Sequence, residues 1–389
     1  MAVTKQYEKK DGTKAWLFQA YLGVDPLTGK EKRTTRRGFK TEKEANLALA
    51  RLQLDVDKNG FRVNYNINTF QDLYEDWIEQ YQHTIKPTTY ERVVALFANH
   101  ILPKLGTLKL EKIKHVAFQK LINKWAGDFK TKSVRNLRTY AKMVFNQGIR
   151  IEVCDSNPFD KVVIPKDQKE PIPAKKEAFY TKEELKYFFE CLQQVEKPIW
   201  ITFFRLLAFT GGRKGEILAL TWDDIDFVSG TININKTLVR IKGKHGIQSP
   251  KTNTSNRVIG IDLETLAILK KWKIEQQKEK LMLGIREASG SELVFNGVCS
   301  TGESKYIYLY RPNYRLGSLY RKFPSLKQIT IHGFRHTHAS LMFESGADIK
   351  VVQKRLGHSN IQVTMDIYTH VSPNHEKNTG ERFAKYVNF

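Results

Sequence analysis

The stretch TIHGFRHTHASL, which begins at residue 330, places three of the chain's ten histidines within seven residues. His332 and His336 are four residues apart, so on a helix they would share one face, as two zinc ligands do. A zinc-peptidase helix needs a glutamate directly after the first histidine, however, and Arg335 stands where its charge would repel a metal ion. His332 and Arg335 instead suit a phosphate group near a helix N-terminus. His336 and His338 are then expected to have structural roles in a packed helix.

Three further stretches contain residues that could bind or react with such an anion. In LLAFTGGRKGEILALTWDDID an apolar helix ends at two glycines, after which Arg213 opens a new helix and Glu216 can hold the arginine in position. SPKTNTSNRVIGI places Lys251 in a polar hairpin loop between two candidate strands. In VVQKRLGHSNIQVTMDIYTHVS a helix ends at a glycine, His358 follows, and Tyr368 comes ten residues later. Taken singly, each of these residues also has an ordinary structural explanation.

The specific signal is an ordered series of an arginine, a lysine, a His-x-x-Arg pair, a histidine and a tyrosine: Arg213, Lys251, His332, Arg335, His358 and Tyr368. The segments TGGRKGEILALTWDDID, HGFRHTHAS and LGHSNIQVTMDIYTH closely resemble the tyrosine recombinase (phage integrase) family. All six catalytic positions of that family are filled by the expected residue type, in order. The motifs cover the second half of the chain. The first half is similar in layout only, to integrases of phages and conjugative transposons of Gram-positive bacteria.

The resemblance implies a site-specific DNA recombinase that cuts and rejoins strands through a covalent 3′-phosphotyrosine, and so integrates or excises a mobile element. The nucleophile would be Tyr368, whose phenol has a reference pKa of about 10 and is a poor nucleophile while protonated. Several cations around one phosphate would favour the phenolate and stabilise the pentavalent transition state. This chemistry requires neither a metal ion nor a nucleotide cofactor.

Five other residues would complete the site. Arg213 and Arg335 can each bind non-bridging oxygens of the phosphate with two hydrogen bonds, and His358 can donate another. The family pattern makes Lys251 the general acid for the departing 5′ oxygen. It makes His332 an aid to proton transfer at the tyrosine.

The composition indicates a polyanionic partner. The chain has 64 Lys and Arg residues against 41 Asp and Glu residues, a formal net charge of +23. The N-terminus shows no apolar signal region, and the apolar run IWITFFRLLAF is broken by Arg205 and is too short to span a bilayer, so it predicts a buried helix. Three cysteines without a CxxC pair are typical of a reducing cytoplasm. We therefore expect a cytoplasmic protein that binds DNA and not a membrane.

The pattern predicts three domains, and with the resemblance the expected fold is mainly α with small β-sheets. Residues 1–60 would form an arm-type DNA-binding domain, a three-stranded sheet with one helix. Residues 66–165 would form a helical, SAM-like core-binding domain, and residues 174–389 a mixed α/β catalytic domain after a proline-rich linker. In the catalytic domain, the segment from GTININKTL through NRVIGID should form one small sheet.

Capping patterns at Thr69 and Thr181 predict helix starts, and a helix beginning near Thr88 is expected to stop before Pro103. Basic residues on one strand of the first domain and along one helix of the second are the candidates for phosphate contacts: Arg33, Arg36, Arg37, Lys130, Lys132, Arg135 and Arg138.

The expected partners are double-stranded DNA, at core sites and at distant arm sites, and three further copies of the chain in a homotetramer on DNA. A host bending protein and an excision factor are the accessory partners that the resemblance suggests. Two alternatives stay open on the same scaffold: a type IB topoisomerase-like enzyme that acts as a monomer, and a non-catalytic DNA-binding regulator. The separate N-terminal sheet favours the recombinase over the first, and the complete six-residue series favours it over the second.

Overall fold

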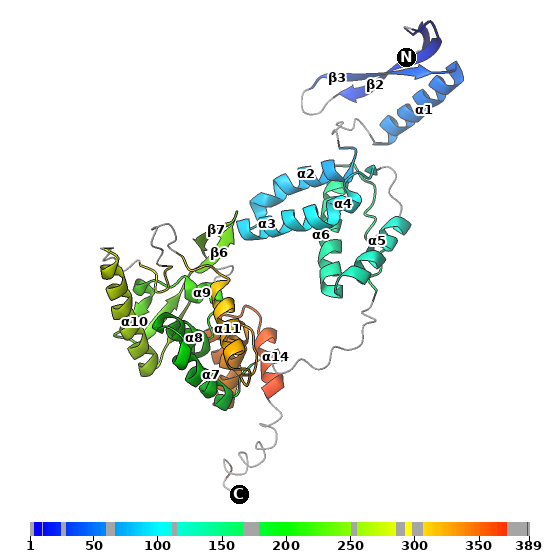
Figure 1. Ribbon diagram of the computed structural model, residues 1–389. Helices are drawn as coiled ribbons and strands as arrows, with labels where there is room; N and C mark the ends of the chain where they lie inside the picture. The colour runs from blue at the N-terminus through cyan, green and yellow to red at the C-terminus, as the bar shows by residue number, and fades with distance from the viewer. Residues whose placement is uncertain are drawn as a thin grey trace. The chain divides into compact units, whose positions relative to one another are not determined.

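The computed structural model describes residues 4–9, 11–24, 29–59, 67–110, 115–165, 179–249, 255–284, 292–297, 306–371 and 387 (Figure 1). The chain divides into two compact units, Met1–Gln168 and Lys169–Phe389. The described elements are mainly helices with small antiparallel sheets, which confirms the expected fold class. Within these residues, no helix is both long and apolar enough to cross a lipid bilayer.

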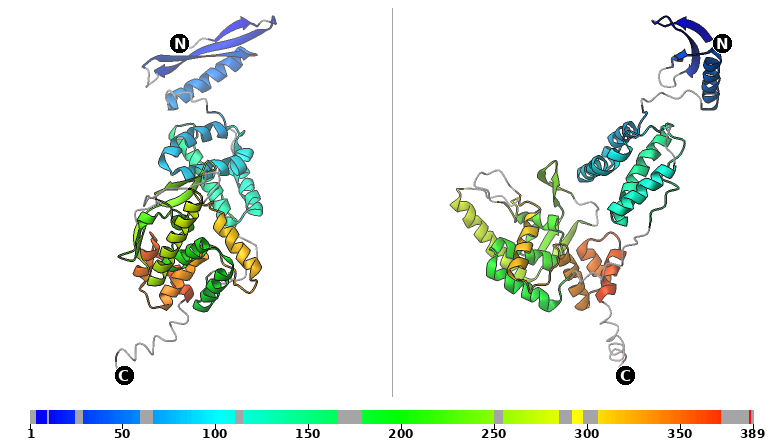
Figure 2. Two further views of the ribbon diagram at one scale, coloured as in Figure 1. Left: turned by 60° about the vertical axis from the view of Figure 1, so that its left-hand side comes forward. Right: turned by 45° about the vertical axis from the view of Figure 1, so that its right-hand side comes forward.

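A three-stranded sheet and one helix begin the first unit: β1 (Thr4–Glu8), β2 (Lys14–Val24), β3 (Glu31–Phe39) and α1 (Glu42–Asn59). β2 is the central strand and pairs antiparallel with both neighbours. Helix α1 lies along one face of the sheet (Figure 2), where Phe18 and Ala20 of β2 are buried with Ala45 and Leu49 of α1. Because side chains alternate along a strand, Leu17, Gln19 and Tyr21 of β2 belong to the opposite face of the sheet.

The rest of the first unit is helical: α2 (Phe70–Tyr81), η1 (Gln82–Thr84), α3 (Pro87–Leu96), η2 (Phe97–Ile101), α4 (Leu102–Leu105), α5 (His115–Asp128) and α6 (Thr131–Arg150). These elements enclose an aromatic-rich core that includes Phe70, Trp77, Phe97, Phe118 and Phe145. The capping box expected at the start of α2 is present. The Thr69 hydroxyl accepts a hydrogen bond from the backbone N–H of Asp72, and the Asp72 carboxylate accepts one from the backbone N–H of Thr69.

The helix expected to stop before Pro103 continues through it, so this expectation is wrong. α3 begins at Pro87 and passes into the π-helical turn η2, after which α4 starts at Leu102 with Pro103 in its first turn. Proline lacks an N–H group, but the first turn of a helix does not need that donor. The π turn η2 separates α3 from α4, so that Pro103 falls in the first turn of a new helix. The spacing of apolar residues in the sequence does not reveal such a turn.

The second unit contains the helices α7 (Lys182–Val195), α8 (Pro198–Thr210), α9 (Lys214–Leu218), α10 (Leu263–Met282), α11 (Arg311–Lys322), α12 (Gly333–Glu344), α13 (Ile349–Leu356) and α14 (Gln362–Val371). α7 starts with the expected capping box at Thr181. α8 is the predicted buried helix, and it packs against α7, α10 and α12. Arg205, which interrupts its apolar sequence, is held by Asp262 and Glu264 at the start of α10.

The strands of the second unit form two sheets, whereas one was expected. β4 (Ile225–Asp226), β5 (Thr231–Ile234) and β8 (Arg257–Gly260) form one antiparallel sheet, and β6 (Thr237–Ile241) pairs with β7 (Lys244–Gln248) in the other. β7 and β8 are therefore not the two arms of a hairpin, contrary to the expectation for the loop with Lys251. Lys251 itself lies outside the described residues. Alternating sequence marks strands but does not select their partners.

Gly211 ends α8 in the left-handed conformation, with φ of 64°. A Cβ atom at this position would lie 2.7 Å from the ring of His338 on α12 and 2.7 Å from the side chain of Leu356 on α13. The turn after α8 is therefore a point where three helices meet closely, and a side chain has no room there.

We predict that Gly211→Ala lowers the free energy of unfolding of the second unit by about 2–4 kcal/mol, because it combines backbone strain with crowding. Chemical unfolding followed by circular dichroism measures this. Gly243→Ala is the matched control: its φ is 76°, but nothing lies within 4 Å of an added Cβ. An equal loss in both variants would show that crowding at Gly211 contributes nothing.

Candidate active site

Arg213 emerges directly after the turn that ends α8. Glu216, one turn into α9, accepts from the Arg213 backbone N–H at 2.9 Å and from its Nη1 at 2.6 Å. The Glu216 side chain is only 4% exposed, whereas 40% of the Arg213 side chain is exposed. Glu216 thus fixes the arginine from the protein side, as expected, and leaves part of its guanidinium open to a ligand.

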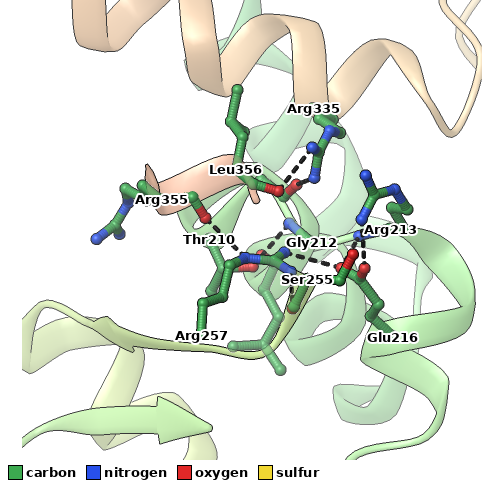
Figure 3. Close-up of polar contacts among 11 residues, drawn as sticks. Thr210, Gly212, Arg213, Glu216, Ser255, Arg257, Arg335, Arg355 and Leu356 are labelled. Carbon is green, nitrogen blue, oxygen red and sulfur yellow. Dashed lines mark hydrogen bonds and ion pairs between the residues drawn. The ribbon is translucent and has the colours of Figure 1, made fainter. Parts of the chain in front are cut away.

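Arg335 lies in the first turn of α12 and is only 2% exposed. Its Nη1 donates to the carbonyl of Gly211 at 2.8 Å, and its Nη2 donates to the carbonyl of Leu356 at 2.7 Å (Figure 3). The guanidinium therefore joins the end of α8 to the end of α13. Burial, with the charges of Arg213 and Arg257, lowers the pKa of Arg335 to about 9, so the side chain remains a cation at neutral pH.

Two imidazoles share the electrostatic environment of these arginines. His332 directly precedes α12, and burial together with His336, Arg335 and Arg213 lowers its pKa to about 4. His358 follows α13, and its pKa falls to about 3 by burial and by the charges of Arg335 and Arg213. Its Nδ1 lies 2.9 Å from the hydroxyl of Thr364. Four of the six predicted residues are thus brought together from three segments.

Of the other two predicted catalytic residues, the structure describes only Tyr368. Lys251 lies outside the described residues. Tyr368 is on α14 and is 40% exposed, and its ring packs edge to face on Phe343 of α12, with centroids 5.1 Å apart. Phe343 comes eight residues after Arg335, which is about 12 Å along a helix axis. The ring of Tyr368 is therefore supported at a different level of α12 from the arginine.

The structural role expected for His338 is confirmed, whereas His336 is closer to the site than expected. His338 is buried, with Nδ1 2.8 Å from the carbonyl of Ala208 and Nε2 accepting from Arg355 at 3.0 Å. The ring of His336 packs edge to face on His332, with centroids 5.1 Å apart. Within the described residues, no group of three or more His, Cys, Asp or Glu side chains could hold a metal ion.

Sequence reasoning missed two further arginines around the site, Arg257 and Arg355. Arg257 donates to the Glu216 carboxylate at 2.8 Å (Figure 3). Arg355 donates to the carbonyl of Phe209 at 2.9 Å. Both stand in stretches where a basic residue on a strand or helix surface is ordinary. The only signal available for Arg257 was its place in an alternating strand next to the Lys251 loop.

The candidate DNA-contacting residues of the first unit do not form a single set. Arg33 and Arg37 pair with Tyr21 and Leu17 of β2, on the sheet face away from α1. Arg36 pairs with Phe18, whose side chain is buried against α1, so Arg36 belongs to the opposite face. The three arginines cluster in sequence but not on one surface.

The basic residues around α6 also differ from one another. Lys130, Lys132 and Arg135 are exposed. Arg138 instead donates through Nε and Nη2 to the carbonyl of Phe159, at 3.3 and 2.9 Å. This bond ties the segment after α6 back onto the helix, so Arg138 has a structural partner within the chain.

A pH dependence follows from the burial of His338. Burial and the Arg355 charge lower its pKa from 6.5 to about 4, so the folded protein holds the ring neutral while the unfolded chain protonates it below pH 6.5. Its contribution to stability is complete above pH 6.5 and is lost as the pH falls towards 4. At pH 5 the loss is about 2 kcal/mol. Urea unfolding at pH 7 and pH 5 should therefore show a flatter pH dependence in His338→Gln than in the native protein, and equal slopes would contradict the assignment.

Three family models match consecutive parts of the chain. Residues 5–56 match the arm DNA-binding domain, residues 69–126 the N-terminal SAM-like domain of phage integrases, and residues 178–375 the phage integrase family. The last match covers more than half of the chain and contains all the residues of the candidate site.

Known proteins resemble the chain over nearly its whole length. The ICEBs1 integrase of Bacillus subtilis is 30% identical over 93% of this chain and 94% of its own, and a XerC-like tyrosine recombinase of Caldanaerobacter subterraneus is 32% identical over 96% of each. Among solved structures, the Tn1549 transposon integrase in complex with a circular intermediate DNA has a TM-score of 0.65 at 22% identity, covering 82% of this chain and all of its own. A lambda integrase tetramer bound to a Holliday junction has a TM-score of 0.55 at 17% identity, covering 91% and 95%. The chain belongs to the phage integrase family, the tyrosine recombinases that cleave and rejoin DNA strands.

Proposed function

We propose that Arg213, Lys251, His332, Arg335, His358 and Tyr368 are the catalytic residues with which this recombinase cuts and rejoins DNA at specific sites. The observation that carries the proposal is the meeting of two arginines and two imidazoles from separate segments at one position. Glu216 and backbone carbonyls fix both guanidinium groups from the protein side. A cluster of this charge and geometry fits one phosphodiester.

In the proposed reaction, the phenolate oxygen of Tyr368 attacks the scissile phosphorus. The bond from phosphorus to the 5′ oxygen breaks, and Lys251 supplies the proton that the departing oxygen needs. Arg213 and Arg335 neutralise the charge that grows on the non-bridging oxygens. Attack by the 5′-hydroxyl of a second strand on the phosphotyrosine reverses the step and joins new partners. No bond energy is lost between the steps, because a phosphodiester is exchanged for a phosphotyrosine ester.

The low pKa values of the two imidazoles suit distinct roles in that reaction. A pKa of about 4 keeps His332 neutral at physiological pH, so it can accept the proton of Tyr368. His358 is also neutral, with a pKa of about 3. If its Nδ1 accepts from the hydroxyl of Thr364, its Nε2 carries the proton and donates to the phosphate. Thr364 then selects the tautomer of His358.

The wider arrangement is proposed by likeness to the relatives. The lambda integrase solved on a Holliday junction is a tetramer, and we infer a homotetramer on two DNA duplexes for this chain. The N-terminal domain, residues 1–60, would bind arm sites. The helical domain, residues 66–165, would bind the core site, where the catalytic domain, residues 174–389, would cut the DNA. A host bending protein and an excision factor would set the direction of recombination. The cytoplasm is the compartment we infer, because bacterial DNA is there.

The first test of the function is a covalent adduct. A nicked suicide substrate that carries the chain's own core site should yield a protein–DNA adduct, resistant to denaturation, in the presence of EDTA. Tyr368→Phe should abolish the adduct, because it lacks the nucleophilic oxygen. Tyr314→Phe, which alters an exposed tyrosine on α11, is the control that should retain it. An adduct formed by Tyr368→Phe, or a strict need for divalent metal, would refute the assignment.

The second test separates the two faces of the N-terminal sheet. Replacing both Arg33 and Arg37 by alanine should weaken arm-site binding and reduce its salt dependence by about one unit of log–log slope per lost phosphate contact. Arg36→Ala is the matched control, since that residue belongs to the face covered by α1. Filter binding over a range of salt concentrations measures the slopes, while core-site cleavage should persist in all variants. A larger effect of Arg36→Ala would mean that the helix-covered face meets the DNA.

A further inference from the structure

Arg257 is the most extensively bonded arginine near the candidate site. It begins β8, and its side chain is 4% exposed. Nη2 donates to Glu216 Oε2 at 2.8 Å, Nε to the carbonyl of Arg355 at 2.8 Å, and Nη1 to the carbonyl of Ser255 at 3.0 Å (Figure 3). This one guanidinium therefore connects α9, the end of α13 and the chain that enters β8.

The carboxylate of Glu216 is shared between two arginines. Its Oε1 accepts from Arg213, and its Oε2 accepts from Arg257. Burial by itself would raise the pKa of Glu216, but the hydrogen bonds and charges of Arg257 and Arg213 bring that pKa below its ordinary value. Glu216 is therefore ionised and fixed at both oxygens.

The charge balance around Glu216 gives Arg257 a consequence beyond packing. With Arg257 present, the single negative charge of Glu216 faces two cations, and one positive charge remains for a phosphate. Without Arg257, Arg213 would be left as the ion-pair partner of the carboxylate among the described residues, and the charge of Arg213 would be largely neutralised before any DNA arrives. The exposed guanidinium of Arg213 would then attract a phosphate less strongly.

Arg257 also acts at the end of α13. The carbonyls of Arg355 and Leu356 lie in the last turn of that helix, where they have no partner within the helix. Arg257 binds the first and Arg335 binds the second. His358 follows two residues later, so the two arginines fix the turn that presents it.

We propose that Arg257 is a positioning residue for strand cleavage: it holds Glu216 so that Arg213 faces the phosphate with its charge intact, and it holds the end of α13 so that His358 faces the same point. This inference rests on the proposed function, because it assigns Arg257 a role in the reaction of that site. The inference also predicts which part of the reaction an Arg257 variant impairs. The variant should stabilise the charge on the phosphate in the transition state less well, while protonation of the leaving group should be unaffected.

The test compares single-turnover cleavage by full-length variants at saturating protein on the nicked core-site substrate. Arg257→Met should cleave about 10–100-fold more slowly, which is the loss typical of removing a residue that orients a functional group without touching the ligand. Its affinity for the core site should change little. Combining it with Glu216→Gln should cost less than the sum of the two single losses, because part of the effect of Arg257 reaches Arg213 through Glu216. Lys236→Met is the control for losing a partly buried ion pair: Lys236 binds Asp224 at 2.5 Å, and the variant should lose stability but keep its cleavage rate.

A substrate with sulfur in place of the bridging 5′ oxygen identifies which step Arg257 serves. The thiolate leaves without a general acid, so the substrate should restore cleavage by Lys251→Met but not by Arg257→Met. Restoration of Arg257→Met would overturn the inference, because Arg257 would then act on the neighbouring Lys251 loop. Cleavage by Arg257→Met at the native rate, or fully additive losses in the double variant, would also overturn it.

Two controls keep the result interpretable. If Arg257→Met does not fold, the double variant with Glu216→Gln removes both buried charges together and is expected to fold and to cleave more slowly than the native protein. Native cleavage by that double variant would refute the inference. If the unaltered protein forms no adduct at all, the proposed function fails; if it forms the adduct and Arg257→Met matches it, only the role of Arg257 fails.

Discussion

The catalytic unit depends on holding several arginines close together at a largely buried position with a single carboxylate between them. Arg335 is 2% exposed, and Arg257 and Glu216 are nearly as buried. Removing such charges from water is costly unless each is paired or fully hydrogen bonded. The carboxylate of Glu216 matches only part of the positive charge. Backbone carbonyls satisfy the remaining guanidinium donors, and a net positive charge is left at the site.

Helix ends supply those carbonyls. The last carbonyls of a helix have no partner within it, and they carry the negative end of its dipole. Side chains from α12, α13 and β8 bind these groups at the ends of α8 and α13. The same contacts that satisfy the helix ends orient the arginines, so stability and the geometry of the site have a common origin. Gly211 permits this approach because a side chain there would collide with both neighbouring helices.

The first unit uses positive charge in a different way. Its exposed basic residues lie on strands and helix surfaces, where a lysine or arginine is hydrated and binds a phosphate by releasing counterions. Exposed charges of this kind give affinity that depends on salt, whereas the buried arginines of the second unit are held by hydrogen bonds to fixed partners within the protein. The net charge of +23 thus combines two kinds of basic residue that composition does not separate.

The sequence by itself determined the family, the fold class, the capped starts of α2 and α7 and the buried helix α8, because these depend on local patterns and on an ordered set of residue types. It did not determine which strands pair, since β7 and β8 belong to different sheets. It also could not show the π turn that carries a helix through Pro103, or that Arg36 belongs to the sheet face opposite Arg33 and Arg37.

Only the tertiary structure revealed the partners of the buried charges. The residues that surround Glu216 come from α9 and β8, about forty positions apart, and the carbonyls that bind Arg335 are more than a hundred positions apart. The local sequence around an arginine in a strand does not indicate whether the side chain faces water or a buried carboxylate. Sequence specifies the chemical groups, and packing decides which of them meet, because the cost of burying a charge is settled by neighbours that are distant along the chain.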